Sequence, residues 1–141
     1  MNGKLILQLS LFGLVMAFAT VFVVPSNLEP LLWLPIFVIC AYLIAKRAPG
    51  RPFLHGLLLG IMNSVWITAV HVALFDPYLA HHAREAETMK SMPMPVSPRV
   101  MMACVGPIVG VVSGVVIGLL ALAAAWIIKR GSRGTTGAPA S

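Results

Sequence analysis

The stretch HHAREAETMKSMPMP, residues 81–95, carries residue types that bind soft metal ions. It holds two histidines, two glutamates and three methionines. Imidazole and thioether groups suit Cu(I), so one hypothesis is an outward-facing protein that binds or transfers copper. The ligands of this candidate metal site would come from His71, His81, His82, Met89, Met92 and Met94.

The same stretch also has the pattern of a surface helix followed by a connector. Asp76 is a good N-cap and Pro77 suits the first position of a helix. Adjacent helical residues point about 100° apart, so His81 and His82 would chelate a metal poorly, and no HExxH or CxxC motif is present. The sequence favours an amphipathic helix over 77–91, with copper binding as the alternative. Three prolines then hold the connector extended: Pro93, Pro95 and Pro98.

Four long apolar runs must position this stretch. Of the 141 residues, 59% are hydrophobic and 10% are charged, whereas soluble domains carry about 25% charged residues. A helix of about 20 apolar residues crosses a hydrocarbon core of about 30 Å, and an open sheet edge cannot be satisfied in lipid. The predicted spans cover residues 5–24, 28–45, 53–75 and 100–128, with Asn27 as the N-cap of the second.

The predicted fold class is therefore an all-α membrane protein. Residues 1–130 are expected to form a single domain, a four-transmembrane-helix bundle with a short extracytoplasmic amphipathic helix between the third and fourth spans. The tail GSRGTTGAPAS, residues 131–141, has the composition of a disordered segment. Cys40 and Cys104 lie inside apolar runs and are too few for a disulfide framework.

Basic residues are distributed unevenly between the two sides of the predicted bundle. The side with both termini carries seven bases and no acid, and the other side carries three bases and four acids. Bases accumulate on the cytoplasmic side of membrane proteins, so we expect a multi-pass protein of the bacterial inner (cytoplasmic) membrane with both termini cytoplasmic. The net charge of +6 is then a topology signal rather than a sign of nucleic-acid binding. The seven bases are Lys4, Lys46, Arg47, Arg51, Lys129, Arg130 and Arg133.

Small residues recur at every fourth position in the third and fourth spans. Such stripes let helix backbones approach closely, which matters because lipid supplies no hydrophobic drive for helix association. Two hypotheses follow: the stripes pack the spans of one chain together, or the stripe of the last span faces a second copy or another membrane protein. The helix-packing residues are Gly56, Gly60, Ser64 and Thr68 in the third span and Gly106, Gly110, Gly114 and Gly118 in the fourth.

The third span also holds the candidate intramembrane polar residues Asn63 and His71. Polar groups inside lipid are costly and often functional. We expect Asn63 to bond to a neighbouring helix, and the hydroxyls of Ser64 and Thr68 to bond across helices or to their own backbone. His71 has two interpretations, a histidine satisfied by a neighbour or a metal ligand or proton relay.

Motifs of common enzyme classes are absent, since the sequence has no GxSxG, P-loop or GxGxxG. The sequence therefore predicts a non-enzymatic membrane protein without a cofactor. It would act through helix packing, as a homo-oligomer, an oligomeric pore included, or as an accessory subunit of a membrane complex. Its partners would be the lipid bilayer and a copy of itself or another membrane protein, with no nucleic acid, and copper binding is the alternative function.

Overall fold

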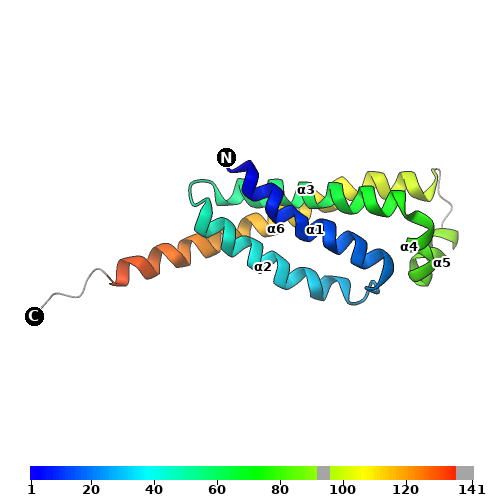
Figure 1. Ribbon diagram of the computed structural model, residues 1–141, viewed down its shortest axis with the longest axis horizontal. Helices are drawn as coiled ribbons and strands as arrows, with labels where there is room; N and C mark the ends of the chain where they lie inside the picture. The colour runs from blue at the N-terminus through cyan, green and yellow to red at the C-terminus, as the bar shows by residue number, and fades with distance from the viewer. Residues whose placement is uncertain (92–95, 136–141) are drawn as a thin grey trace, which may run out of the picture.

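The computed structural model describes residues 1–91 and 96–135, and the side chains of all of these except 133–135. The described residues form six α-helices and no strand (Figure 1). In chain order the helices are α1 (Gly3–Phe22), α2 (Glu29–Arg47), α3 (Pro52–Ala73), α4 (Phe75–His81), α5 (Ala83–Ser91) and α6 (Pro98–Thr135).

The four longest helices have the length and composition of membrane spans. α1, α2, α3 and α6 each contain an apolar window long enough to cross a bilayer. At a rise of about 1.5 Å per residue, the 22 residues of α3 reach about 33 Å, and a hydrocarbon core is about 30 Å thick. The all-helical fold class and the four apolar spans are therefore confirmed.

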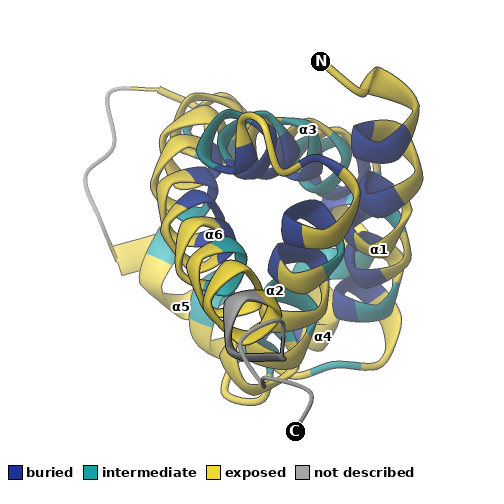
Figure 2. Cartoon of the chain, turned by 90° about the vertical axis from the view of Figure 1, so that its left-hand side faces the viewer, coloured by how far each residue is buried: buried dark blue, intermediate teal, exposed yellow. Residues whose placement is uncertain are grey.

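The spans are not packed equally against one another. α3 packs most extensively against α6 and, on another face, against α1. α2 packs mainly against α6 and touches α1 and α3 only briefly. The order of neighbours is therefore α1, α3, α6 and α2, and the buried faces of these helices turn inward (Figure 2).

Two separate apolar cores result from this packing. The larger core takes residues from all four spans, with Leu9, Ile44, Leu59 and Ile117 among its buried members. The smaller core takes its buried residues from α1 and α3, and α4 packs on it through Tyr78. Because α2 and α6 contribute nothing to the smaller core, the space beside it is left unfilled between α2, α3 and α6.

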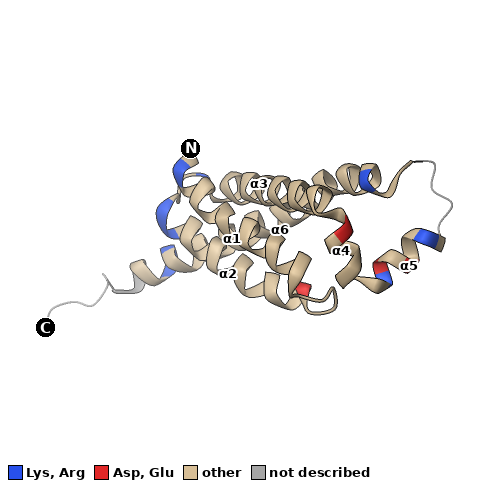
Figure 3. Ribbon diagram, turned by 45° about the vertical axis from the view of Figure 1, so that its right-hand side comes forward, with Lys and Arg blue, Asp and Glu red and all other residues tan. Residues whose placement is uncertain are grey.

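Charge divides the molecule in the same direction as the two cores. The start of α1 and the C-terminal end of α6 lie at one end of the molecule, and Lys and Arg residues gather there (Figures 1 and 3). The acidic residues lie toward the opposite end, with α4 and α5. The larger core is at the end with the termini, since it contains Leu5 near the start of α1 and Ala48 just after α2.

Three local predictions differ from the structure. α2 begins at Glu29 with Leu28 as its N-cap and no side-chain cap, so Asn27 does not cap it. The predicted helix over 77–91 is two helices, because His82 has non-helical backbone angles. Asp76 is not a cap either, since a single residue, Leu74, separates α3 from α4 and the helix resumes before Asp76 is reached.

The ends of the last predicted span also differ. α6 starts at Pro98 and continues to Thr135, so residues 131–135 of the tail that was expected to be disordered are helical. Pro93 and Pro95 of the predicted connector, and residues 136–141 of the tail, lie outside the described residues.

Candidate functional site

A seam of small residues joins α3 to α6. The two helices are antiparallel, and the stripes meet in register: Gly56 faces Gly118, Gly60 faces Gly114, Ser64 faces Gly110, and Thr68 faces Gly106. A Cβ added to Gly56 would lie 2.5 Å from the Cα of Gly118, and one added to Gly114 would lie 2.6 Å from the carbonyl oxygen of Leu57. The α6 stripe therefore faces α3 of the same chain and leaves no free small-residue surface along this line for a second copy.

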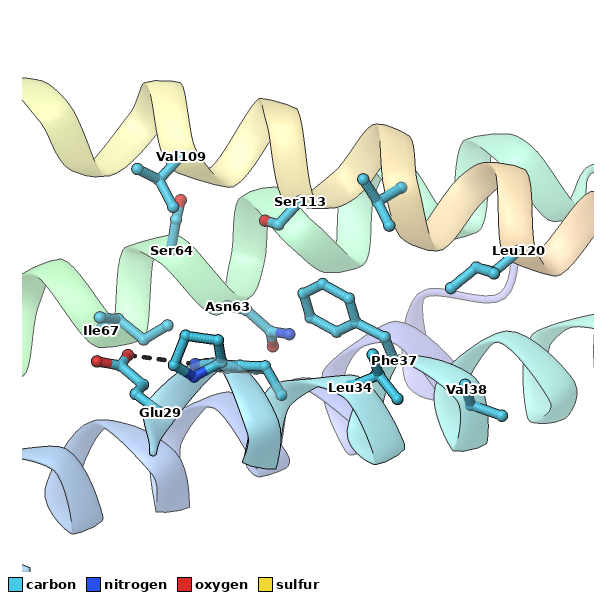
Figure 4. Close-up of a pocket in the computed structure, with 13 residues that line it drawn as sticks. Glu29, Leu34, Phe37, Val38, Asn63, Ser64, Ile67, Val109, Ser113 and Leu120 are labelled. Carbon is cyan, nitrogen blue, oxygen red and sulfur yellow. Dashed lines mark hydrogen bonds between the residues drawn. The ribbon is translucent and has the colours of Figure 1, made fainter. Parts of the chain in front are cut away.

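Next to the seam lie two adjoining cavities. The inner cavity, of about 690 Å³, lies between α2, α3 and α6 (Figure 4). The outer cavity, of about 640 Å³, lies between α3, α6 and the segment formed by α4 and α5. The two share four wall residues and together are called the groove below. The shared residues are Glu29, Ser64, Ile67 and Val109.

The inner cavity is mostly apolar, with aromatic walls from Trp33 and Phe37. Two of its polar residues are satisfied by their own helices: Ser64 Oγ donates to the Ile61 carbonyl at 2.8 Å, and Ser113 Oγ donates to the Gly110 carbonyl at 3.2 Å. Such bonds are common for helical serines inside apolar surroundings. Neither serine therefore needs a ligand.

Asn63 is the exception in this cavity. Its residue surface is 3% exposed, yet neither Nδ2 nor Oδ1 has a hydrogen-bond partner among the described residues. Gly13 of α1 packs against this amide so closely that a Cβ added to Gly13 would lie 2.5 Å from Asn63 Oδ1. The side chain extends from α3 toward α2 (Figure 4), and Asn63 is one of the residues that line the inner cavity. The expected bond from Asn63 to a neighbouring helix is therefore not formed, and a buried amide capable of donating and accepting is left over.

The outer cavity carries charge. Glu29 of α2 and Arg84 and Glu85 of α5 line it, together with Tyr78 of α4. The ion pair found in the described part of the chain joins Asp76 to Arg99, so these three charges have no charged partner within it. Glu29 does accept a hydrogen bond from Trp33 Nε1 at 3.2 Å.

Tyr78 is held in its neutral form. Burial, and after it the negative charges of Glu85 and Glu29, raises the pKa of Tyr78 to about 12. Both carboxylates therefore act on the same phenol, although they come from helices far apart in the sequence. At neutral pH the phenol keeps its proton and remains a hydrogen-bond donor.

The histidines of the candidate metal site do not converge. The ring of Tyr78 stacks between His71, at a centroid distance of 4.6 Å, and His82, at 4.2 Å. His71 Nε2 is hydrogen-bonded to Thr20 Oγ1 of α1 at 2.8 Å, and the exposed His81 donates from Nδ1 to the Pro77 carbonyl at 3.0 Å. His71 thus has the neighbour that its first interpretation requires.

Metal-binding geometry is otherwise not found in residues 1–91 and 96–135, which contain no group of three or more His, Cys, Asp or Glu placed to hold an ion. Met89 lines the outer cavity together with His71. Met92 and Met94 lie outside the described residues. Among the described residues, His71 and Met89 are therefore the candidate ligands that line the groove.

The groove residues that were not singled out from the sequence include Glu29, Trp33 and Tyr78. Glu29 looks like an ordinary acid in the first turn of a helix, and Trp33 and Tyr78 have the positions of an interfacial aromatic belt. The available signal was that Glu29 and Trp33 are four residues apart, which places them on one face of α2. No protein-family model, curated protein or solved structure matches this chain.

Proposed function

We propose that this chain is a bacterial inner-membrane protein that binds a glycerolipid in the groove and catalyses no reaction. The observation that carries the proposal is Asn63, a buried amide that lines an apolar cavity and has no hydrogen-bond partner among the described residues. A buried polar group left unpaired costs about 1–3 kcal/mol. A ligand oxygen that bonds to the amide, after the side chain rotates toward the cavity, would remove that cost. A glycerolipid brings ester carbonyl oxygens attached to apolar chains.

The dimensions and walls of the groove favour this class of ligand. Each cavity falls within the range of about 300–1,000 Å³ that is usual for small-molecule sites. Leu34 and Val38 line the inner cavity while remaining 68% and 52% exposed, so the groove opens sideways along α2. In a bilayer that opening faces lipid, and a lipid chain can reach the cavity without crossing water.

The orientation proposed for the chain places both termini in the cytoplasm. The bases gathered at the end with the termini support it (Figure 3), and α4, α5 and the outer cavity then lie at the extracytoplasmic surface. Reporter fusions after Arg51 should behave as cytoplasmic and fusions after Lys90 as periplasmic. The reverse result at Lys90 would overturn this orientation.

The packing of the α6 stripe against α3 bears on the functions that the sequence suggested. The stripe that pointed to a partner helix is occupied by α3, so a homo-oligomer or an accessory subunit would need another surface. His71 and His82 are separated by the ring of Tyr78. The apolar inner cavity and the charged outer cavity therefore support lipid binding over these alternatives.

Lipid binding can be followed through Trp33, which lines the inner cavity. A variant with Trp66→Phe and Trp126→Phe keeps Trp33 as its single tryptophan and can be titrated, in detergent, with a phospholipid that carries brominated acyl chains. We expect saturable quenching of Trp33. Quenching that rises linearly with lipid, as in passive mixing with the micelle, would contradict the proposal.

The decisive variant is Asn63→Leu, because leucine keeps the branched shape of asparagine and removes both polar atoms. One hydrogen bond contributes about 0.5–1.5 kcal/mol, so lipid affinity should fall by about two- to twelvefold. The lipid-free protein should become more stable by about 1 kcal/mol, since the unpaired amide is gone. Ser113→Ala is the matched control in the same cavity and should change neither property. Unchanged lipid affinity in Asn63→Leu would refute the proposal that Asn63 forms a hydrogen bond with the lipid.

A further inference from the structure

We infer that the mouth of the groove selects a phospholipid headgroup in which an ammonium group stands next to a phosphate, as in phosphoethanolamine. The inference rests on the proposed lipid binding and adds the headgroup class to it. The mouth is formed by the three charged residues of the outer cavity, Glu29, Arg84 and Glu85.

The charges at the mouth have the composition of a zwitterion receptor. One guanidinium and two carboxylates line a single cavity, and none of them is in an ion pair with another described residue. Arginine binds phosphate through paired N–H donors, and a primary ammonium can donate to carboxylates. The neutral phenol of Tyr78, in the same cavity, is a further donor suited to a phosphate oxygen.

Other common headgroups match this set of charges less well. A glycerol headgroup leaves the lipid anionic, so it would gain Arg84 but meet the two carboxylates without a compensating cation. A choline headgroup carries a positive charge but has no N–H, so it cannot donate a hydrogen bond to Glu29 or Glu85. Only a headgroup with both a phosphate and a hydrogen-bearing ammonium uses all three residues.

The order of chemical groups along the groove matches the order of groups along such a lipid. The charged mouth and the inner cavity share Glu29 and Ile67 as walls. Asn63 lies one helical turn below Ile67 on α3, about 6 Å deeper. Beyond Asn63 the inner cavity is walled by Phe37 and Leu120. A phospholipid presents an ammonium, a phosphate, ester carbonyls and acyl chains in that same sequence.

The test is a competition experiment on the full chain with Trp33 as its single tryptophan. Bound brominated lipid is displaced by unbrominated phosphatidylethanolamine, phosphatidylglycerol or phosphatidylcholine with identical acyl chains. We expect the ethanolamine lipid to compete about tenfold better than either of the others, because charge-assisted hydrogen bonds to the ammonium are lost in both. Equal competition by all three would overturn the headgroup inference and leave the proposed lipid binding standing. Absence of saturable binding by any lipid would overturn both.

Charge variants separate the mouth from the rest of the groove. Glu29→Gln combined with Glu85→Gln keeps side-chain shape, and the amide oxygen at position 29 can still accept from Trp33. This double variant should lose the tenfold preference for the ethanolamine lipid. Glu87→Gln is the matched control, since Glu87 is exposed on α5 and does not line the groove. Asn63→Leu should weaken all three lipids alike. A preference that persists in the double variant, or disappears in Glu87→Gln, would refute the assignment.

Discussion

The end of the molecule that holds the termini and the end that holds the groove are built from the same spans but are filled to different degrees. At the first end, all four spans contribute to one core, in which Ile44 and Leu59 are fully buried. At the second end, buried core residues come from α1 and α3 alone, and α2 borders a cavity instead. The glycine seam between α3 and α6 runs through both ends, so the seam does not account for the difference.

α2 is the element that distinguishes the two ends. Every buried residue of α2 follows Pro35 in the sequence, beginning with Cys40, and the residues that line the inner cavity extend from Glu29 to Val38. A proline inside a helix cannot donate to the carbonyl four residues earlier and favours a bend. One helix thus closes the bundle with its second half and forms a cavity wall with its first half.

The largest effect should come from breaking the seam that both ends share. Gly114→Leu places a branched side chain where a Cβ alone would lie 2.6 Å from the Leu57 carbonyl oxygen, and backbone cannot move aside cheaply. We expect a loss of about 3 kcal/mol or more, seen as a much lower melting temperature in detergent. Gly131→Leu is the control in the same helix, because nothing lies within 4 Å of a Cβ there. Equal melting of the two variants would show that the seam is not the scaffold.

A smaller effect should separate the filled end from the groove end directly. Ile44→Ala removes a side chain that is 0% exposed and leaves a void in the larger core. It should cost about 2 kcal/mol, the lower end of the range for such a truncation. Leu34→Ala on the same helix removes a groove wall that is 68% exposed and should cost less than about 0.5 kcal/mol. Thermal unfolding of both variants measures the contrast. Similar losses in the two would mean that α2 is packed uniformly and that the ends do not differ as described.

Features set by local composition could be predicted from the sequence. Runs of apolar residues located the four spans, because crossing length depends only on residue count and helical rise. The repeat of small residues at every fourth position picked out the residues that meet in the α3–α6 seam. The sequence left open whether the partner of the α6 stripe was α3 or another chain, since a stripe shows that a backbone approaches closely and not which backbone it is.

Features set by tertiary geometry could not be predicted in this way. Asn63 stood out as a polar residue in an apolar run, but its surroundings depend on how far α2 lies from α3, which no local pattern records. Asp76 has the residue type of a cap, yet α4 follows α3 after one residue and begins before it. Tyr78 looked like a membrane anchor because stacking between His71 and His82 requires the turn at Leu74 and the break at His82.

The smallest effect should come from the charged contact at the groove end. Asp76 of α4 pairs with Arg99 of α6 at 2.9 Å, but their side chains are 82% and 51% exposed. Exposed ion pairs contribute about 0–1 kcal/mol and are weakened by salt. The neighbouring Phe75 is buried, and the Arg99 guanidinium lies over the Phe75 ring at 5.1 Å. The packing of Phe75 therefore already stabilises the position of α4. Asp76→Asn should therefore change stability by less than about 0.5 kcal/mol at any salt concentration, measured by thermal unfolding at low and high ionic strength. A larger loss of stability that occurs only at low salt would mean that the ion pair between Asp76 and Arg99 holds α4 in place beside the outer cavity. Lipid binding would then depend on ionic strength even in variants that keep Glu29, Arg84 and Glu85.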